Sequence, residues 1–116
     1  MSRQTIFDMP FSKVYPLLIA KAERKGRSRA EVLEVTGWLT GYSTDEVERL
    51  LSGDLSYGDF FRHAPQLNEK RRLIKGSVCG VELDEIEDPL MLEIRYLDKL
   101  VDELAKGKAM EKILRG

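Results

Sequence analysis

The chain has 116 residues, which is enough for one domain with a single hydrophobic core and too short for two. Hydrophobic residues make up 42% of it and charged residues 34%, a composition that excludes an intrinsically disordered chain. With 19 Lys and Arg against 20 Asp and Glu, the net charge is −1, so no overall excess of charge attracts nucleic acid or an anionic membrane.

The N-terminal residues lack the uninterrupted apolar core of a signal peptide. Nowhere do about eighteen apolar residues follow one another, as a membrane-spanning helix requires. The single cysteine, Cys79, excludes an internal disulfide and a cysteine-based zinc cluster, and it suits a reducing compartment. We therefore expect a cytoplasmic protein with no membrane partner.

Two helices are predicted in the first third of the chain. The first follows Ser12, whose hydroxyl can cap its N-terminus, and ends near Gly26. The second begins at Ser28, which is three residues before Glu31, the spacing of a capping box. Gly41 can adopt the left-handed conformation that closes this second helix.

Two shorter helices follow. Ser43 and Glu46 repeat the capping-box spacing, and Gly53 marks the end of that helix. Ser56 offers a further cap before one or two helical turns that stop at Pro65. The segments from Ser28 to Gly41 and from Ser43 to Gly53 each have a capping box at the start and a glycine at the end. Two such complete helices in succession indicate an all-α protein.

The C-terminal half contains the clearest helix and the least certain segment. A helix is predicted over 68–75, whereas 76–83 is open between a helical and an extended conformation. Asp88 and Pro89 then form a cap and a first helical residue. The apolar stripe of the helix that begins at Pro89 is Leu90, Ile94, Leu97, Val101 and Leu104. Gly107 predicts a kink in this helix or a separate final turn after it.

The opposite face of the last helix carries charged pairs. Arg95 with Asp98, and Asp102 with Lys106, have the three- and four-residue spacings of helical ion pairs, and we expect this face to be solvated. Together the elements predict one compact domain, residues 1–116, of five or six helices in an orthogonal array with a long amphipathic C-terminal helix.

The aromatic residues mostly lie on the apolar stripes, so we expect them in the core rather than on a base-stacking platform. They are Tyr15, Trp38, Tyr42, Tyr57, Phe60, Phe61 and Tyr96.

Residues able to perform catalysis or bind metal are few. His63 and Cys79 could form a nucleophile and base pair if the fold joined them, but neither lies in a known nucleophile motif. An acidic cluster could hold a hard cation, although capping of the last helix explains it better. This cluster consists of Asp84, Glu85, Glu87 and Asp88. We therefore assign no catalytic, cofactor-binding or metal-binding residue.

Two basic stretches, 21–29 and 70–75, form a positive surface for phosphates if they meet in space. If the two stretches remain separate, their side chains face solvent or complement helix C-termini. Their cations are Lys21, Arg24, Lys25, Arg27, Arg29, Lys70, Arg71, Arg72 and Lys75.

Several segments resemble a family of short bacterial proteins that has only a domain-of-unknown-function label, number two thousand two hundred. The segments are 14–16, 38–42, 74–76, 78–81, 86–91, 95–100 and 106–114. The resemblance covers nearly the whole chain. It implies an all-helical fold in a bacterial cell and supplies no activity, substrate or site residue.

Three functions follow from these observations. The favoured one is a noncatalytic helical module that binds a macromolecular partner or a second copy of itself, because helix faces are abundant and no catalytic constellation is assembled. The second is nucleic-acid binding through stretches 21–29 and 70–75. The third is a small enzyme that uses Cys79, His63 or the acidic cluster 84–88.

Overall fold

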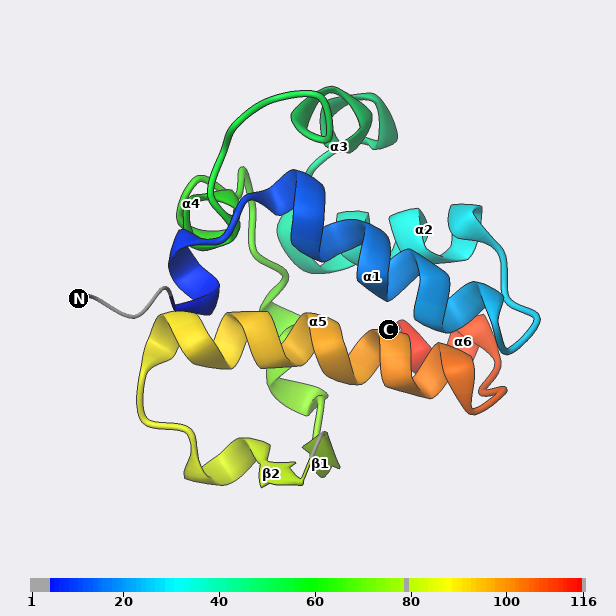
Figure 1. Cartoon of the computed structure of the whole chain (residues 1–116). Helices are drawn as coiled ribbons and strands as arrows, with labels where there is room; N and C mark the ends of the chain where they lie inside the picture. Colours follow the sequence, from blue (N-terminus) through cyan, green and yellow to red (C-terminus); the bar gives the residue numbers. More distant parts are fainter. Residues whose placement is uncertain (1–4, 79, 116) are drawn as a thin grey trace.

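The computed structural model describes residues 5–78 and 80–115, and within them the protein is built almost entirely of helices (Figure 1). The α-helices are α1 (Phe11–Glu23), α2 (Arg29–Thr40), α3 (Thr44–Leu50), α4 (Tyr57–Arg62), α5 (Pro89–Ala105) and α6 (Met110–Ile113). Short 3-10 helices are η1 (Ile6–Asp8), η2 (Glu69–Leu73) and η3 (Leu83–Glu85). The strands β1 (Ser77–Val78) and β2 (Val81–Glu82) form an antiparallel hairpin. The predicted all-α class is confirmed.

The helix starts are set by local side-chain caps. Ser28 accepts a hydrogen bond from the Glu31 backbone N–H, and the Glu31 carboxylate accepts one from the Ser28 backbone N–H. Ser43 and Glu46 form the same reciprocal pair at the start of α3. Asp88 caps α5 by accepting from the first free N–H groups of that helix. Each of these caps agrees with the prediction from spacing.

The start of α1 differs from the prediction. Pro10 rather than Ser12 is the N-cap residue, and the Phe11 N–H donates to the Leu55 carbonyl at 2.8 Å. A long-range backbone bond therefore replaces the expected serine cap, because the chain before α1 runs beside the segment that leads into α4.

The core lies where α5 packs against α1, α2 and α4 (Figure 1). Phe11 is central to it: its ring stacks on Phe60 with a centroid distance of 4.2 Å and on Tyr15 at 4.8 Å. Six of the seven aromatic residues predicted to be internal are buried, and Trp38 is the one that is only partly buried. The apolar stripe of α5 is also internal, with Leu90 partly buried at its start.

The segment 68–83 is less helical than predicted. Only the 3-10 helix η2 forms within 68–75. In the described part of 76–83, β1 and β2 pair Ser77 with Glu82 and Val78 with Val81, and Leu83 begins η3. The backbone before η2 is held against the end of α2, where Asn68 N–H donates to the Leu39 carbonyl, and Asn68 is the N-cap residue of η2.

The charged face of α5 is not uniformly solvated, contrary to expectation. Glu103 is 6% exposed and binds Arg115 at 2.6 Å, which ties the end of the described chain to α5. Burial raises the pKa of the Asp98 carboxyl, although Arg95 lies 3.3 Å away. Gly107, with φ of 87°, separates α5 from α6, as its position predicted. None of the described helices is long and apolar enough to cross a membrane.

Candidate functional site

The residues considered as candidates for catalysis or metal binding do not form a site in the part of the chain that the structure describes. His63 is the exposed C-cap residue of α4. The acidic residues of 84–88 are exposed along η3 and the turn before α5, where Asp88 caps the helix. No three His, Cys, Asp or Glu among the described residues are grouped as a metal site requires. Cys79 lies outside the described residues.

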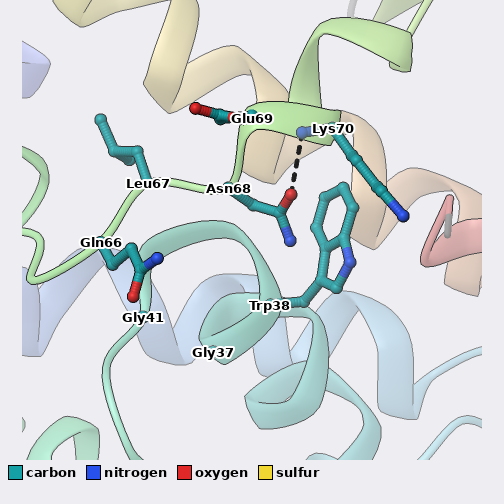
Figure 2. Close-up of a pocket in the computed structure, with 8 residues that line it drawn as sticks. All are labelled: Gly37, Trp38, Gly41, Gln66, Leu67, Asn68, Glu69 and Lys70. Atoms are coloured by element: carbon teal, nitrogen blue, oxygen red, sulfur yellow. Dashed lines mark hydrogen bonds between the residues drawn. The ribbon is translucent and has the colours of Figure 1, made fainter.

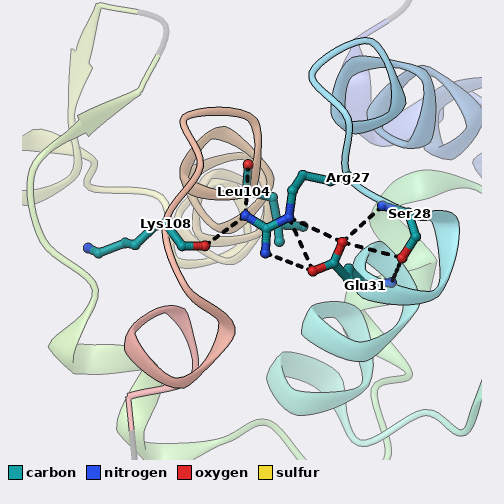
Figure 3. Close-up of polar contacts among 5 residues, drawn as sticks. All are labelled: Arg27, Ser28, Glu31, Leu104 and Lys108. Carbon is teal, nitrogen blue, oxygen red and sulfur yellow. Dashed lines mark hydrogen bonds and ion pairs between the residues drawn. The ribbon is translucent and has the colours of Figure 1, made fainter.

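Arg27, from the first basic stretch, is committed to structure (Figure 3). Its guanidinium donates to the Glu31 carboxylate at 2.7 Å and to the backbone carbonyls of Leu104 and Lys108 at 3.2 and 2.7 Å. It therefore joins the start of α2 to the C-terminal end of α5. Two other cations of the stretch are also paired, Lys21 with Asp102 and Arg29 with Glu48.

The second basic stretch lies elsewhere on the molecule. Arg71 pairs with Glu93 at 2.8 Å, and both side chains are largely buried. Arg27 contacts α5 at Leu104, eleven residues further along than Glu93 (93 to 104), which corresponds to roughly 16 Å of helix. Three of the five cations of the first stretch are therefore paired, and Arg71 of the second stretch contacts a different part of α5 from Arg27.

A cleft of about 660 Å³ opens instead at the C-terminal end of α2 (Figure 2). One wall is the end of α2, and the other is the segment that leads into η2. We call it the Trp38 cleft. Its lining residues are Gly37, Trp38, Gly41, Gln66, Leu67, Asn68, Glu69 and Lys70.

The second wall of the Trp38 cleft is held to the first by backbone hydrogen bonds. Gln66 N–H donates to the Thr40 carbonyl, and Asn68 N–H donates to the Leu39 carbonyl, both at 3.0 Å. Gly41, at φ of 85°, makes the close approach feasible, since a Cβ at that position would lie 2.8 Å from the Gln66 nitrogen. The cleft is therefore part of the folded framework.

The polar side chains of the cleft have hydrogen-bonding groups that are not paired within the protein. The Asn68 side-chain oxygen accepts from the Lys70 backbone N–H at 2.8 Å, which leaves the Asn68 amide nitrogen as a donor. The side chains of Lys70 and Glu69 point in opposite directions, and Lys70 extends alongside the Trp38 indole (Figure 2). Neither Lys70 nor Glu69 has an ion pair recorded among the described residues.

Among the described residues that line it, the cleft has no hydroxyl, thiol or imidazole side chain. Its only titratable side chains are Glu69 and Lys70, and Figure 2 shows them diverging. A second, smaller cavity of about 290 Å³ is lined by Tyr42, Glu46, Arg49 and Leu50. Neither His63 nor the acidic cluster lines either cavity.

Sequence reasoning did not identify the Trp38 cleft, because it placed Trp38 in the core. One signal was available: Gly37 and Gly41 lie one helical turn apart on either side of Trp38 and leave part of the helix surface without side chains. Such a strip permits another backbone to come close. Which backbone occupies it depends on the fold, since Gln66 is distant in the chain.

Comparisons with known proteins agree with the helical fold. The family model "Uncharacterized protein conserved in bacteria (DUF2200)" matches residues 5–115. The crystal structure of "uncharacterized protein SP1917" is 52% identical in sequence, with a TM-score of 0.92 over 97% of this chain and 93% of that chain. No curated protein matches the chain.

Proposed function

This chain belongs to the bacterial family DUF2200, and we propose that it is a noncatalytic helical binding protein whose recognition site is the Trp38 cleft. The family description and the similar structure assign no activity. The proposal includes the cytoplasmic location expected from the sequence.

The observation that carries the proposal is a partly buried tryptophan in a preformed cleft. The volume of about 660 Å³ falls within the range of small-molecule sites. The backbone bonds from Gln66 and Asn68 to α2 hold the walls in place before a ligand arrives, which lowers the ordering cost of binding. The Trp38 indole N–H has no hydrogen bond recorded within the described residues, so it is available to a ligand.

A large partner surface has less support. An exposed apolar face on 88–115 would be the sign of a surface for a macromolecular partner or a second copy, and the described part of that segment has no large exposed hydrophobic side chain. The large hydrophobic side chains that are exposed among the described residues are Leu17 (65%) and Leu73 (57%), both outside it. Such isolated residues are ordinary on protein surfaces.

The test is a fragment screen followed by two-dimensional ¹⁵N–¹H NMR. The chain has a single tryptophan, so the one indole N–H resonance reports on the cleft directly. We expect fragments that shift the Trp38 indole signal together with the side-chain amide signals of Gln66 and Asn68.

Variants at two apolar positions provide the control. Trp38→Leu should abolish ligand-detected binding of those fragments, whereas Leu73→Ala, at an exposed position that does not line the cleft, should leave it unchanged. A screen in which no fragment perturbs the cleft signals would remove the proposed function.

A further inference from the structure

Asn68 is held in the wall of the Trp38 cleft by hydrogen bonds from several directions. Its backbone N–H donates to the Leu39 carbonyl at 3.0 Å. Its backbone carbonyl accepts from the Arg71 backbone N–H at 3.1 Å and from the Arg71 guanidinium at 2.8 Å. Its side-chain oxygen accepts from the Lys70 backbone N–H at 2.8 Å. Both the backbone and the side-chain amide of Asn68 are therefore oriented before a ligand arrives.

Arg71 joins this wall of the cleft to α5. Its Nε lies 2.8 and 3.1 Å from the two carboxylate oxygens of Glu93, and its Nη1 donates to the Asn68 carbonyl. The Arg71 and Glu93 side chains are only 12% and 13% exposed. A largely buried ion pair adds little net stability compared with apolar residues of the same volume, whereas a planar guanidinium fixes the direction of its hydrogen bonds. The position of Asn68 therefore depends on α5 as well as on α2.

The Asn68 amide nitrogen is the part of this side chain that remains for a ligand. It makes no hydrogen bond to another described residue, and it is not buried. The Asn68 side chain extends toward the Trp38 indole, and both residues line the cleft (Figure 2). A ligand that packs on the Trp38 ring therefore meets a donor whose direction is already set.

The other polar groups of the cleft do not favour one class of ligand. Glu69 and Lys70 carry opposite charges and are both exposed. Four backbone carbonyls have no donor among the described residues, those of Trp38, Gly41, Gln66 and Leu67. Such carbonyls are present whichever side chain stands at those positions. Of the side chains that line the cleft, that of Asn68 is the one held by a hydrogen bond to another described residue.

We propose that Asn68 determines the specificity of the Trp38 cleft and that Arg71 is its positioning residue. The ligand presents a carbonyl oxygen that accepts from the Asn68 amide nitrogen, while a flat apolar part of the ligand packs on the Trp38 ring. Arg71 acts through Asn68, because it bonds the Asn68 carbonyl and does not line the cleft. This inference rests on the proposed function and names the group in the ligand that the cleft recognises.

Two probes with the same carbon skeleton test the role of Asn68. Acetophenone has a carbonyl oxygen that ethylbenzene lacks, and both are titrated while the Trp38 indole signal is observed. Asn68→Asp keeps an oxygen for the Lys70 N–H but replaces the free donor with a carboxylate oxygen. We expect this variant to bind acetophenone about fivefold or more weakly than the wild type and to bind ethylbenzene within about twofold of it.

Arg71→Lys tests the positioning. Lysine retains the positive charge opposite Glu93 but lacks the guanidinium that bonds Glu93 and the Asn68 carbonyl together. We expect acetophenone to bind about threefold or more weakly and ethylbenzene to be unaffected, with no further loss when Arg71→Lys is added to Asn68→Asp. The control is Arg27→Lys, at an arginine of similar exposure that also contacts α5 but does not line the cleft, and it should leave both affinities unchanged.

Failure of the inference is distinct from failure of the proposed function. Equal losses of affinity for the two probes in either variant, no loss in Arg71→Lys, or additive losses in the double variant would overturn the inference. A cleft that responds to other fragments but not to acetophenone would also overturn it, and the binding site would stand. If no fragment perturbs the Trp38 indole signal, the proposed function itself is removed.

Discussion

At the scale of single residues, Arg27 shows how a basic side chain can be fully engaged in hydrogen bonds within the protein. Its side chain is 15% exposed and donates to a carboxylate near the start of α2, to the Leu104 carbonyl in the last turn of α5 and to the Lys108 carbonyl just after that helix. The Leu104 carbonyl also accepts from the Gly107 N–H, whereas the Lys108 carbonyl has no other donor among the described residues. A basic residue that suggested phosphate binding therefore acts as a clamp between two helices.

Replacing Arg27 should destabilise the protein more than replacing a neighbouring arginine. Arg27→Ala removes the Glu31 pair and the hydrogen bonds to the Leu104 and Lys108 carbonyls, and it leaves the Lys108 carbonyl unpaired, so we expect the free energy of unfolding to fall by about 2 kcal/mol in urea titrations. Arg24→Ala, at an exposed arginine with no ion pair recorded among the described residues, should change it by less than about 0.5 kcal/mol. Equal effects of the two would contradict the clamp.

The same contact makes stability depend on pH. The hydrogen bond from Arg27, supported by the Ser28 N–H, lowers the pKa of Glu31 from 4.5 to about 2. Because the folded state binds this proton more weakly than the unfolded state, the contribution of Glu31 is fully present above about pH 4.5 and is lost as the pH falls toward 2.

Glu31→Gln should therefore show a shallower loss of stability than the wild type between pH 4.5 and 2, measured by urea unfolding at several pH values. Its remaining pH dependence reflects other carboxylates, such as Asp102, whose pKa is also lowered. Glu34→Gln, on the exposed side of α2, is the control and should follow the wild-type slope. An unchanged slope in Glu31→Gln would refute the assignment.

At the scale of elements, the end of α2 is where a local signal and a distant segment meet. The left-handed Gly41 ends the helix, and the same residue has no side chain to keep Gln66 away. The segment before η2 then satisfies carbonyls of the last turn of α2 through backbone donors. One glycine therefore both closes a helix and forms a wall of the Trp38 cleft.

Substitution at Gly41 should disturb the cleft as well as the helix end. Gly41→Ala adds left-handed strain of about 1 kcal/mol and a Cβ 2.8 Å from the Gln66 nitrogen, so we expect a total loss of about 2–3 kcal/mol and a shifted Trp38 emission maximum. Gly107→Ala has a similar φ of 87° and nothing within 4 Å of its Cβ. It should lose only the strain of about 1 kcal/mol and leave the emission unchanged.

At the scale of the whole molecule, the two ends of the described chain reach the same core. Phe11, at the start of α1, and Ile113, in α6, are both fully buried. Arg115 binds the largely buried Glu103 and so holds the segment after Gly107 against α5. Removal of apolar volume near the C-terminus should therefore weaken the entire domain rather than one local turn.

Unfolding of the whole chain tests the prediction of one domain over residues 1–116. Circular dichroism of the helices and emission of the single Trp38 should change at the same urea concentration. Ile113→Ala should lower the unfolding free energy by about 2–4 kcal/mol in both signals, whereas Leu17→Ala, at a position 65% exposed, should have little effect. Separate transitions would show that α6 or the cleft unfolds independently.

The sequence by itself determined the elements whose causes lie within a few residues. The capping boxes at Ser28 and Ser43, the Asp88 cap and the break at Gly107 were predictable because each depends on one side chain and neighbouring backbone groups. The apolar stripe of α5 was equally predictable, since helical periodicity alone places its apolar residues on one face.

Only the tertiary structure decided how distant groups pair. Whether Arg27 meets phosphate or the carbonyls of α5, and whether Trp38 joins the core or lines a cleft, depends on contacts between segments far apart in the chain. Backbone donors of Gln66 and Asn68 are satisfied by carbonyls at the end of α2. No local pattern encodes that pairing, and it is what forms the candidate site.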